Sequence, residues 1–255
     1  MNTKNSVERI VLFVALMILL VSTANAENWS KTEAQIRYGN LSVPSFAGGG
    51  KKTTILTFQY ASEWKYGDNF SFVDIFDSEF KNDIYGEWYS NFSLGKITGK
   101  KIEFGPINDV GLLAGINFGA DANVLKYLPG VRLSWNVSGF TFVSTDFMYY
   151  IDANKGISSG GAPKESDGFK LDISWERSFK IGHTKFSFEG HAEYLSELNN
   201  ELGEKSNSLI LAQPQLRWYV QEKLAVGIEY QFWINKLGDP KIDESAVQLL
   251  IVYQF

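Results

Sequence analysis

Hydrophobic and polar side chains alternate with a period of two over most of this sequence. In residues 169–176 and 185–194, apolar residues occupy every second position and mostly charged or hydroxyl-bearing residues lie between them. Successive side chains of a β-strand point to opposite faces, so the pattern predicts strands with one apolar and one polar face. About twelve such segments follow one another, with lengths near those of tilted strands that cross a bilayer.

The first hairpin, within residues 64–74, indicates which face is functional. Glycine and asparagine tolerate positive φ, and aspartate and asparagine side chains hydrogen-bond nearby backbone, so residues 66–69 are predicted to reverse the chain. After the turn, Phe70, Phe72 and Asp74 share one face of the next strand. An acid beside two phenyl rings is explained if that face lines a pore and the other face contacts lipid.

The connections between segments alternate in length, as periplasmic turns and extracellular loops do in outer-membrane barrels. Short connections are predicted at 66–69, 138–139, 178–182 and 221–223. Long connections are predicted at 39–51, 151–166, 196–207 and 235–245. Residues 95–106 form a long basic connection that breaks this rule. Pro214 removes a ladder donor within a predicted strand, where a bulge is the expected explanation.

The first residues have the pattern of a secretory signal. Lys4 and Arg9 precede the apolar run 10–21, and Ala24 and Ala26 supply small residues at a cleavage site. The run is shorter than the roughly 20 apolar residues of a membrane-spanning helix. We therefore expect residues 1–26 to be removed and residues 27–255 to form one domain.

Composition narrows the fold further. The chain has 19 Phe, 12 Tyr and 7 Trp but no second long apolar run, so membrane helices are not predicted. In lipid only helices and closed barrels satisfy every backbone polar group. The sequence therefore predicts an all-β fold, a transmembrane antiparallel up-and-down β-barrel of about twelve strands, rather than a soluble sandwich. The absence of cysteine excludes disulfides and thiolate metal sites, and the net charge of −5 argues against nucleic acid as a partner.

Two motifs resemble the nucleoside-specific channel-forming porins of the bacterial outer membrane. They are W-K-Y-G-D-N-F-S-F-V-D at 64–74 and Y-G-E-W-Y at 85–89, and the terminal Phe255 is similar to the signal read by the barrel assembly machinery. The resemblance implies a monomeric barrel of Gram-negative bacteria with both termini in the periplasm, surrounded by lipid and lipopolysaccharide. It implies passage of nucleosides and deoxynucleosides, and in some members a receptor role for phage or bacteriocin.

The expected solute contacts are the aromatic and polar residues on the predicted lumen face. Bases stack on aromatic rings with roughly 1–3 kcal/mol each, and ribose hydroxyls donate to carboxylates. For each acid an interior salt bridge is an equal alternative, and for Phe70 and Phe72 packing at the mouth is the alternative. The candidates are Phe70, Phe72, Asp74, Tyr85, Glu87, Tyr89, Asn91, Arg132, Asp146, Lys170, Asp172, Glu189, Arg217, Tyr219 and Glu229.

Some outer-membrane enzymes also use barrels of similar size. An outer-membrane enzyme needs a histidine in a fixed catalytic array, whereas His183 and His191 are followed two positions later by Lys185 and Glu193 rather than serine. His191 is interpreted as a solvated lumen residue, and no catalytic residue, cofactor or metal site is predicted. A general small-solute porin and a surface receptor with a closed lumen remain alternatives to the nucleoside channel.

Overall fold

The computed structural model describes residues 27–42, 52–78, 82–120 and 122–255. The predicted signal at 1–26 lies outside the described residues. No helix in the described ranges is long and apolar enough to cross a membrane. The barrel strands are β1 Glu27–Asn40, β2 Lys52–Trp64, β3 Gly67–Ser78, β4 Asn82–Ser93, β5 Ile107–Gly119, β6 Val124–Trp135, β7 Phe142–Asp152, β8 Gly168–Ile181, β9 Thr184–Leu195, β12 Leu209–Ala212, β13 Gln215–Tyr219, β14 Leu224–Ile234 and β15 Glu244–Gln254.

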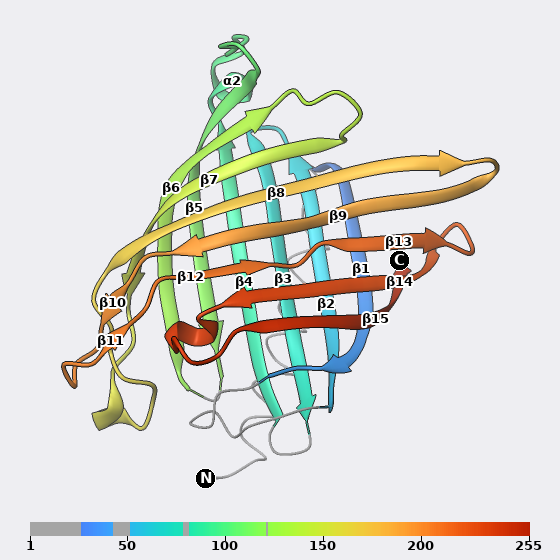
Figure 1. The fold of residues 1–255 in the computed structure, drawn as a ribbon. Helices are drawn as coiled ribbons and strands as arrows, with labels where there is room; N and C mark the ends of the chain where they lie inside the picture. Colours follow the sequence, from blue (N-terminus) through green and yellow to red (C-terminus); the bar gives the residue numbers. More distant parts are fainter. Residues whose placement is uncertain (1–26, 43–51, 79–81, 121) are drawn as a thin grey trace.

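These strands close into a barrel, drawn in Figure 1. Consecutive strands pair antiparallel, and β1 pairs with both β2 and β15, which closes the sheet. The short segments β12 and β13 both lie between β9 and β14, so they are two halves of one interrupted strand. The described residues thus form a closed barrel of twelve antiparallel strands, which confirms the predicted fold class. The monomeric state stays a prediction.

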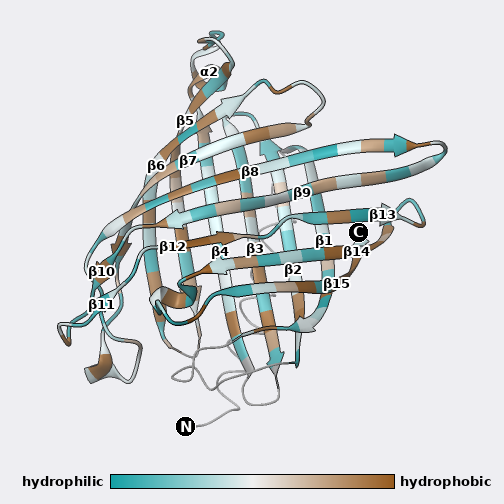
Figure 2. Ribbon diagram, viewed as in Figure 1, coloured by the Kyte–Doolittle hydropathy of each residue, from teal (hydrophilic) through white to brown (hydrophobic). Residues whose placement is uncertain are grey.

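Polarity is inverted relative to a soluble protein. Leu249 and Phe169 on the outer face are each 65% exposed, whereas the inward side chains of Glu33 and Gln248 are 0% exposed. Figure 2 shows hydrophobic and hydrophilic residues alternating along the strands. A barrel with an apolar exterior and a polar interior is suited to cross a bilayer, because its outer face meets lipid while the ladders satisfy the backbone.

The first hairpin turns earlier than the sequence predicts. The ladder between β2 and β3 continues to the pair Trp64 and Gly67, so the chain reverses at residues 65–66, and the predicted turn at 66–69 is wrong. Gly67 does not need positive φ. A Cβ atom at Gly67 would instead lie 1.7 Å from the backbone oxygen of Asn91 in β4, so glycine is required for close strand approach.

Pro214 interrupts one strand, as the sequence indicates. Residues 213–214 separate β12 from β13, and the ladder resumes beyond them. On the neighbouring strand, Gly190 has φ 151°, and a Cβ atom there would lie 2.4 Å from the backbone oxygen of Gln213. The distorted segment therefore depends on a glycine opposite it.

The connections lie at two unlike ends of the barrel. A hydrogen bond of 3.1 Å from the N–H of Phe140 to the oxygen of Val137 closes the predicted turn at 138–139. The β8–β9 turn covers only 182–183, because strand pairing continues further than predicted for 178–182. The β4–β5 connection lies at this short-turn end and begins with α2, Leu94–Thr98. The opposite end holds η2 Ile157–Ser159, β10 Leu198–Asn199, β11 Lys205–Ser206 and η3 Lys236–Gly238.

Candidate functional site

The candidate site is the inner wall of the barrel. Strand register places all fifteen candidate residues on inward faces; for example, Asp74 is paired with Thr57 and Tyr85 at one level. Their contact with solute stays a prediction. Their contacts divide most of these residues into an ionic network around Arg37 and Arg217 and an aromatic group on β3 and β4. The two groups meet at β3, where Asp74 is paired with Tyr85.

A dense ionic network covers the wall formed by β1 and its neighbours. Arg37 of β1 binds Asp74 of β3 and Glu229 of β14, with shortest distances of 2.8 Å to each carboxylate. Its second guanidinium nitrogen also donates to Thr57 at 2.7 Å. Gln248 donates to Glu229 at 2.8 Å. Two of the predicted acids thus have the salt-bridge role that the sequence left as an alternative.

A second cation extends this network toward the short-turn end. Arg217 of β13 lies 3.0 Å from Glu33 of β1 and 3.1 Å from Glu189 of β9. Glu33 and Arg217 are at most 2% exposed, so side chains fill this part of the interior. Tyr219 lies nearby, with the ammonium of Lys185 4.1 Å from its ring centroid. Ion pairs buried this deeply hold their partners in place because each unpaired charge would be costly.

Arg37 and Glu33 belong to this network, although neither is among the fifteen residues predicted from the sequence. The signal was present in the sequence, because Glu33, Gln35 and Arg37 alternate with Ala34, Ile36 and Tyr38. The alternation in this segment is weak, so the sequence does not predict a lumen role for its polar face. The structure shows that this face carries the central cation of the ionic network.

The neighbouring wall, from β3 to β7, carries aromatic and apolar side chains. The ring of Phe72 lies 6.2 Å, centroid to centroid, from both Phe70 and Tyr85. Tyr89 continues the group and packs with an apolar cluster that Phe70 also contacts. The other buried members of that cluster are Leu113, Leu128 and Met148. The sequence prediction does not include these three residues. The signal for two of them is that Leu113 and Leu128 are apolar residues on strand faces that are otherwise polar.

Polar groups are set into this aromatic wall. Glu87 accepts hydrogen bonds from Tyr85 at 2.5 Å and from Asn117 at 2.7 Å. Lys170 of β8 lies 2.6 Å from Glu193 and 3.6 Å from Glu87 of β4. Because β5, β6 and β7 separate β4 from β8, this contact crosses part of the interior.

Arg132 links the remaining candidates on this wall. It binds Asp146 through two hydrogen bonds of 2.7 Å and Asp68 through one of 2.7 Å. Asn91 donates to the other oxygen of Asp68 at 2.8 Å. Two hydrogen bonds to Asp146 and one to Asp68 hold the guanidinium of Arg132 in a defined orientation. Asp68, which is fixed by Arg132, in turn fixes the side chain of Asn91.

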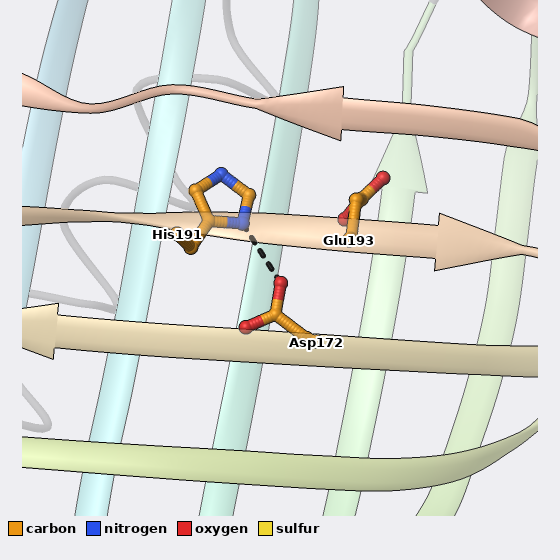
Figure 3. Close-up of side chains that lie close together, drawn as sticks. All are labelled: Asp172, His191 and Glu193. Atoms are coloured by element: carbon orange, nitrogen blue, oxygen red, sulfur yellow. Dashed lines mark hydrogen bonds and ion pairs between the residues drawn. The ribbon is translucent and has the colours of Figure 1, made fainter. Parts of the chain in front are cut away.

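His191 forms a third polar cluster with Asp172 and Glu193, shown in Figure 3. Its Nδ1 lies 2.8 Å from Asp172 Oδ2, and its Nε2 lies 2.9 Å from Oε1 of Gln213. Both ring nitrogens are therefore occupied by residues other than a serine, unlike the arrangement of a serine hydrolase. Glu189, which the sequence placed beside His191, contacts Arg217 instead.

Comparisons with known proteins identify the fold. The sequence has no significant match to a protein-family model or to a curated protein. The structure is similar to that of the NanC porin, with a TM-score of 0.51 and 14% identity over 87% of this chain and 100% of that chain. The fold is a porin-type barrel.

The KdgM porin aligns with a TM-score of 0.49 and 10% identity over 89% of this chain and 99% of its own. A further structure shows KdgM in complex with disordered oligogalacturonate, at the same TM-score. At these identities the likeness concerns the barrel alone. The resemblance to a porin is supported at the level of fold, and nucleoside specificity stays a prediction.

Proposed function

We propose that this chain is an outer-membrane channel for passive diffusion of nucleosides and deoxynucleosides. One observation carries the proposal: the aromatic side chains of Phe70, Phe72 and Tyr85 lie directly beside the paired charges around Arg37, because Asp74, which binds Arg37, is two residues from Phe72 and is paired with Tyr85. A nucleoside also has two unlike parts, a flat base and a hydroxyl-bearing sugar. The base matches the aromatic wall, and the sugar matches the polar groups.

The energies suit passage rather than tight binding. Stacking of a base on a ring contributes roughly 1–3 kcal/mol, and each sugar hydroxyl exchanges water for a carboxylate or amide. Several weak stations conduct better than one strong site, because a solute must also leave. Phe70, Phe72 and Tyr85 follow one another along β3 and β4, which supports a series of such stations.

Charge supports discrimination against nucleotides. Acids outnumber bases among the fifteen candidate residues, and several lie beside the aromatic wall, including Glu87 and Asp146. An excess of carboxylates over cations in a lumen disfavours anions and admits neutral solutes. We therefore expect adenosine to permeate faster than adenosine monophosphate.

Flux into liposomes tests the proposal. Purified protein is reconstituted, and swelling rates are measured for adenosine, a sugar of equal size and adenosine monophosphate, with protein-free liposomes as control. Faster entry of adenosine than of the sugar supports the nucleoside channel. Equal rates would show a general porin, and no flux above the control would show a barrel with a closed lumen, suited to a receptor.

Orientation follows from the two unlike ends. We infer that the short-turn end, where β1 begins and Phe255 lies, faces the periplasm. The opposite end carries the longer connections with η2, β10 and β11, as extracellular loops do. Protease added to intact cells should then cut within residues 196–208 and spare the turn at 182–183; the reverse pattern would invert the orientation.

A further inference from the structure

We propose that Asp172, His191 and Glu193 form a binding site for a divalent first-row transition-metal ion, with Zn²⁺ as the probe. Asp172 of β8 is directly paired with Glu193 of β9, and His191 lies two residues before Glu193 on the same inward face. One ligand atom from each residue lies within 4.8 Å of the other two. Figure 3 shows the three side chains converging from two neighbouring strands.

The histidine is oriented for such a role by Gln213. The amide nitrogen of Gln213 donates to Gln231 at 3.0 Å and to Glu229 at 3.4 Å, so its oxygen is the atom that faces His191. That oxygen lies 2.9 Å from Nε2 and accepts a hydrogen bond from the Nε2–H group. A hydrogen bond of this kind fixes the tautomer of a metal-binding histidine and leaves the other nitrogen for the ion.

The other ring nitrogen, Nδ1, points at the carboxylate of Asp172. It lies 2.8 Å from Asp172 Oδ2, so without an ion a proton occupies the space between them. Metal–nitrogen and metal–oxygen bonds are about 2.0–2.2 Å long, so an ion can replace that proton after a small separation of the two groups. Proton release is the normal accompaniment of metal binding by histidine.

Nearby charges permit a dication. Lys170 contacts Oε2 of Glu193, which leaves Oε1 of the same carboxylate for the ion. Lys170 contacts Glu193 and Glu87, and His191 contacts Asp172. Three carboxylates therefore face one lysine and one histidine, and the histidine gives up its Nδ1 proton when the ion binds. All three ligand residues are partly exposed on the inner wall, which gives an ion a path from solution.

The donor set selects the kind of metal. One imidazole with two carboxylates suits Zn²⁺ and its first-row neighbours, whereas Ca²⁺ and Mg²⁺ prefer oxygen ligands alone. The sequence did not predict this site, because Asp172 and His191 belong to different strands. The proposal concerns equilibrium binding and does not depend on nucleoside passage.

Calorimetric titration of the purified full-length protein with Zn²⁺, after chelator treatment, tests the site. We expect saturable binding of one ion per chain, no competition by excess Mg²⁺ or Ca²⁺, and an absorption spectrum of Co²⁺ with nitrogen and oxygen ligands. His191→Gln should weaken binding at least about tenfold, and Gln213→Leu about tenfold through loss of orientation. Heat-modifiable electrophoretic mobility checks that each variant is folded.

His183 provides the matched control. It is the other of the two histidines in the chain and lies exposed in the β8–β9 turn. His183→Gln should bind Zn²⁺ as the wild type does. Asp172→Asn, which preserves shape, should also lose affinity, so the site remains testable if His191→Gln does not fold. The proposal would be overturned if the wild-type protein showed no saturable Zn²⁺ binding. It would also be overturned if His183→Gln lost Zn²⁺ affinity and His191→Gln kept it.

Discussion

The ammonium of Lys170 on β8 lies 3.6 Å from the carboxylate of Glu87 on β4, although three strands separate the two residues around the barrel. The contact narrows the interior beside the aromatic wall, since Lys170 also lies 3.4 Å from the hydroxyl of Tyr89. Both ends of the bridge are buried. Lys170 is therefore the side chain whose removal should most directly alter passage along this wall.

Lys170→Met should increase cation selectivity. The change removes the positive charge that balances Glu87 and Glu193, and a more negative interior favours cations. The reversal potential in a salt gradient across a planar bilayer measures this. Lys65→Met removes the same charge from the exposed turn and should leave selectivity unchanged; equal shifts in both variants would contradict a lumen role for Lys170.

Phe72→Ala should reduce the preference for adenosine over a sugar of equal size. Loss of one stacking surface costs roughly 1–3 kcal/mol, and the effect should be larger with Phe70→Ala in addition. Liposome swelling with both solutes gives the ratio. Phe58→Ala, on the outer face of β2, is the control and should preserve it. Unchanged selectivity in the Phe70 and Phe72 variants would assign these rings to packing alone.

Arg37→Met should strongly destabilise the barrel. It leaves Asp74 and Glu229 buried without their cation, a defect that costs about 3–5 kcal/mol. Denaturant unfolding in detergent, followed by electrophoretic mobility, measures the loss. Arg177→Met, at an exposed position, should change stability by no more than about 0.5 kcal/mol. Similar stabilities of the two variants would show that the Arg37 network contributes little.

Gly190→Ala should impair folding far more than Gly160→Ala. Both glycines have positive φ, 151° and 76°, but a Cβ atom at Gly160 meets nothing within 4 Å. At Gly190 it would meet the backbone at Gln213. Strain alone costs about 1–2 kcal/mol, so the Gly160 variant should fold. The yield of heat-modifiable barrel compares them, and equal yields would show that the strand interruption adapts to a side chain.

Glu201 should make the long-loop end sensitive to acid. Backbone N–H groups of Lys164 and Ile157 donate to its carboxylate at 3.0 Å and 2.8 Å, which holds the pKa of Glu201 below its ordinary value of 4.5. A lowered pKa in the folded state means that the stabilisation is present above the ordinary value. It is lost as the pH falls through the lowered pKa.

Limited proteolysis of residues 153–167 measures this effect. At neutral pH, Glu201→Gln should be cut faster than the wild type, because the uncharged amide is a weaker acceptor. Below the lowered pKa, wild type and variant should be cut at similar rates. Glu222→Gln, in the turn at the other end, is the control and should be cut like the wild type. A wild-type rate that is independent of pH would contradict the role of Glu201.

Many individual contacts required the tertiary structure. The sequence placed Lys170 and Glu87 on inward faces but gave no reason to pair them, because their strands are not neighbours. The turn at 65–66 and the glycine at 67 depend on the distance to β4 rather than on local turn preferences. The weak alternation of its strand does not predict a role for Arg37, yet three partners converge on it.

The sequence by itself determined the strands, their two faces and the closure into a membrane barrel. The physical reason is that side chains alternate with a period of two, and lipid requires an apolar outer face and a complete backbone ladder. Only the tertiary structure decided which inward residues meet. Sheet curvature brings Arg37 to Glu229 and Lys170 to Glu87, and strand pairing brings Asp172 to His191, and none of these proximities is written in the spacing along the chain.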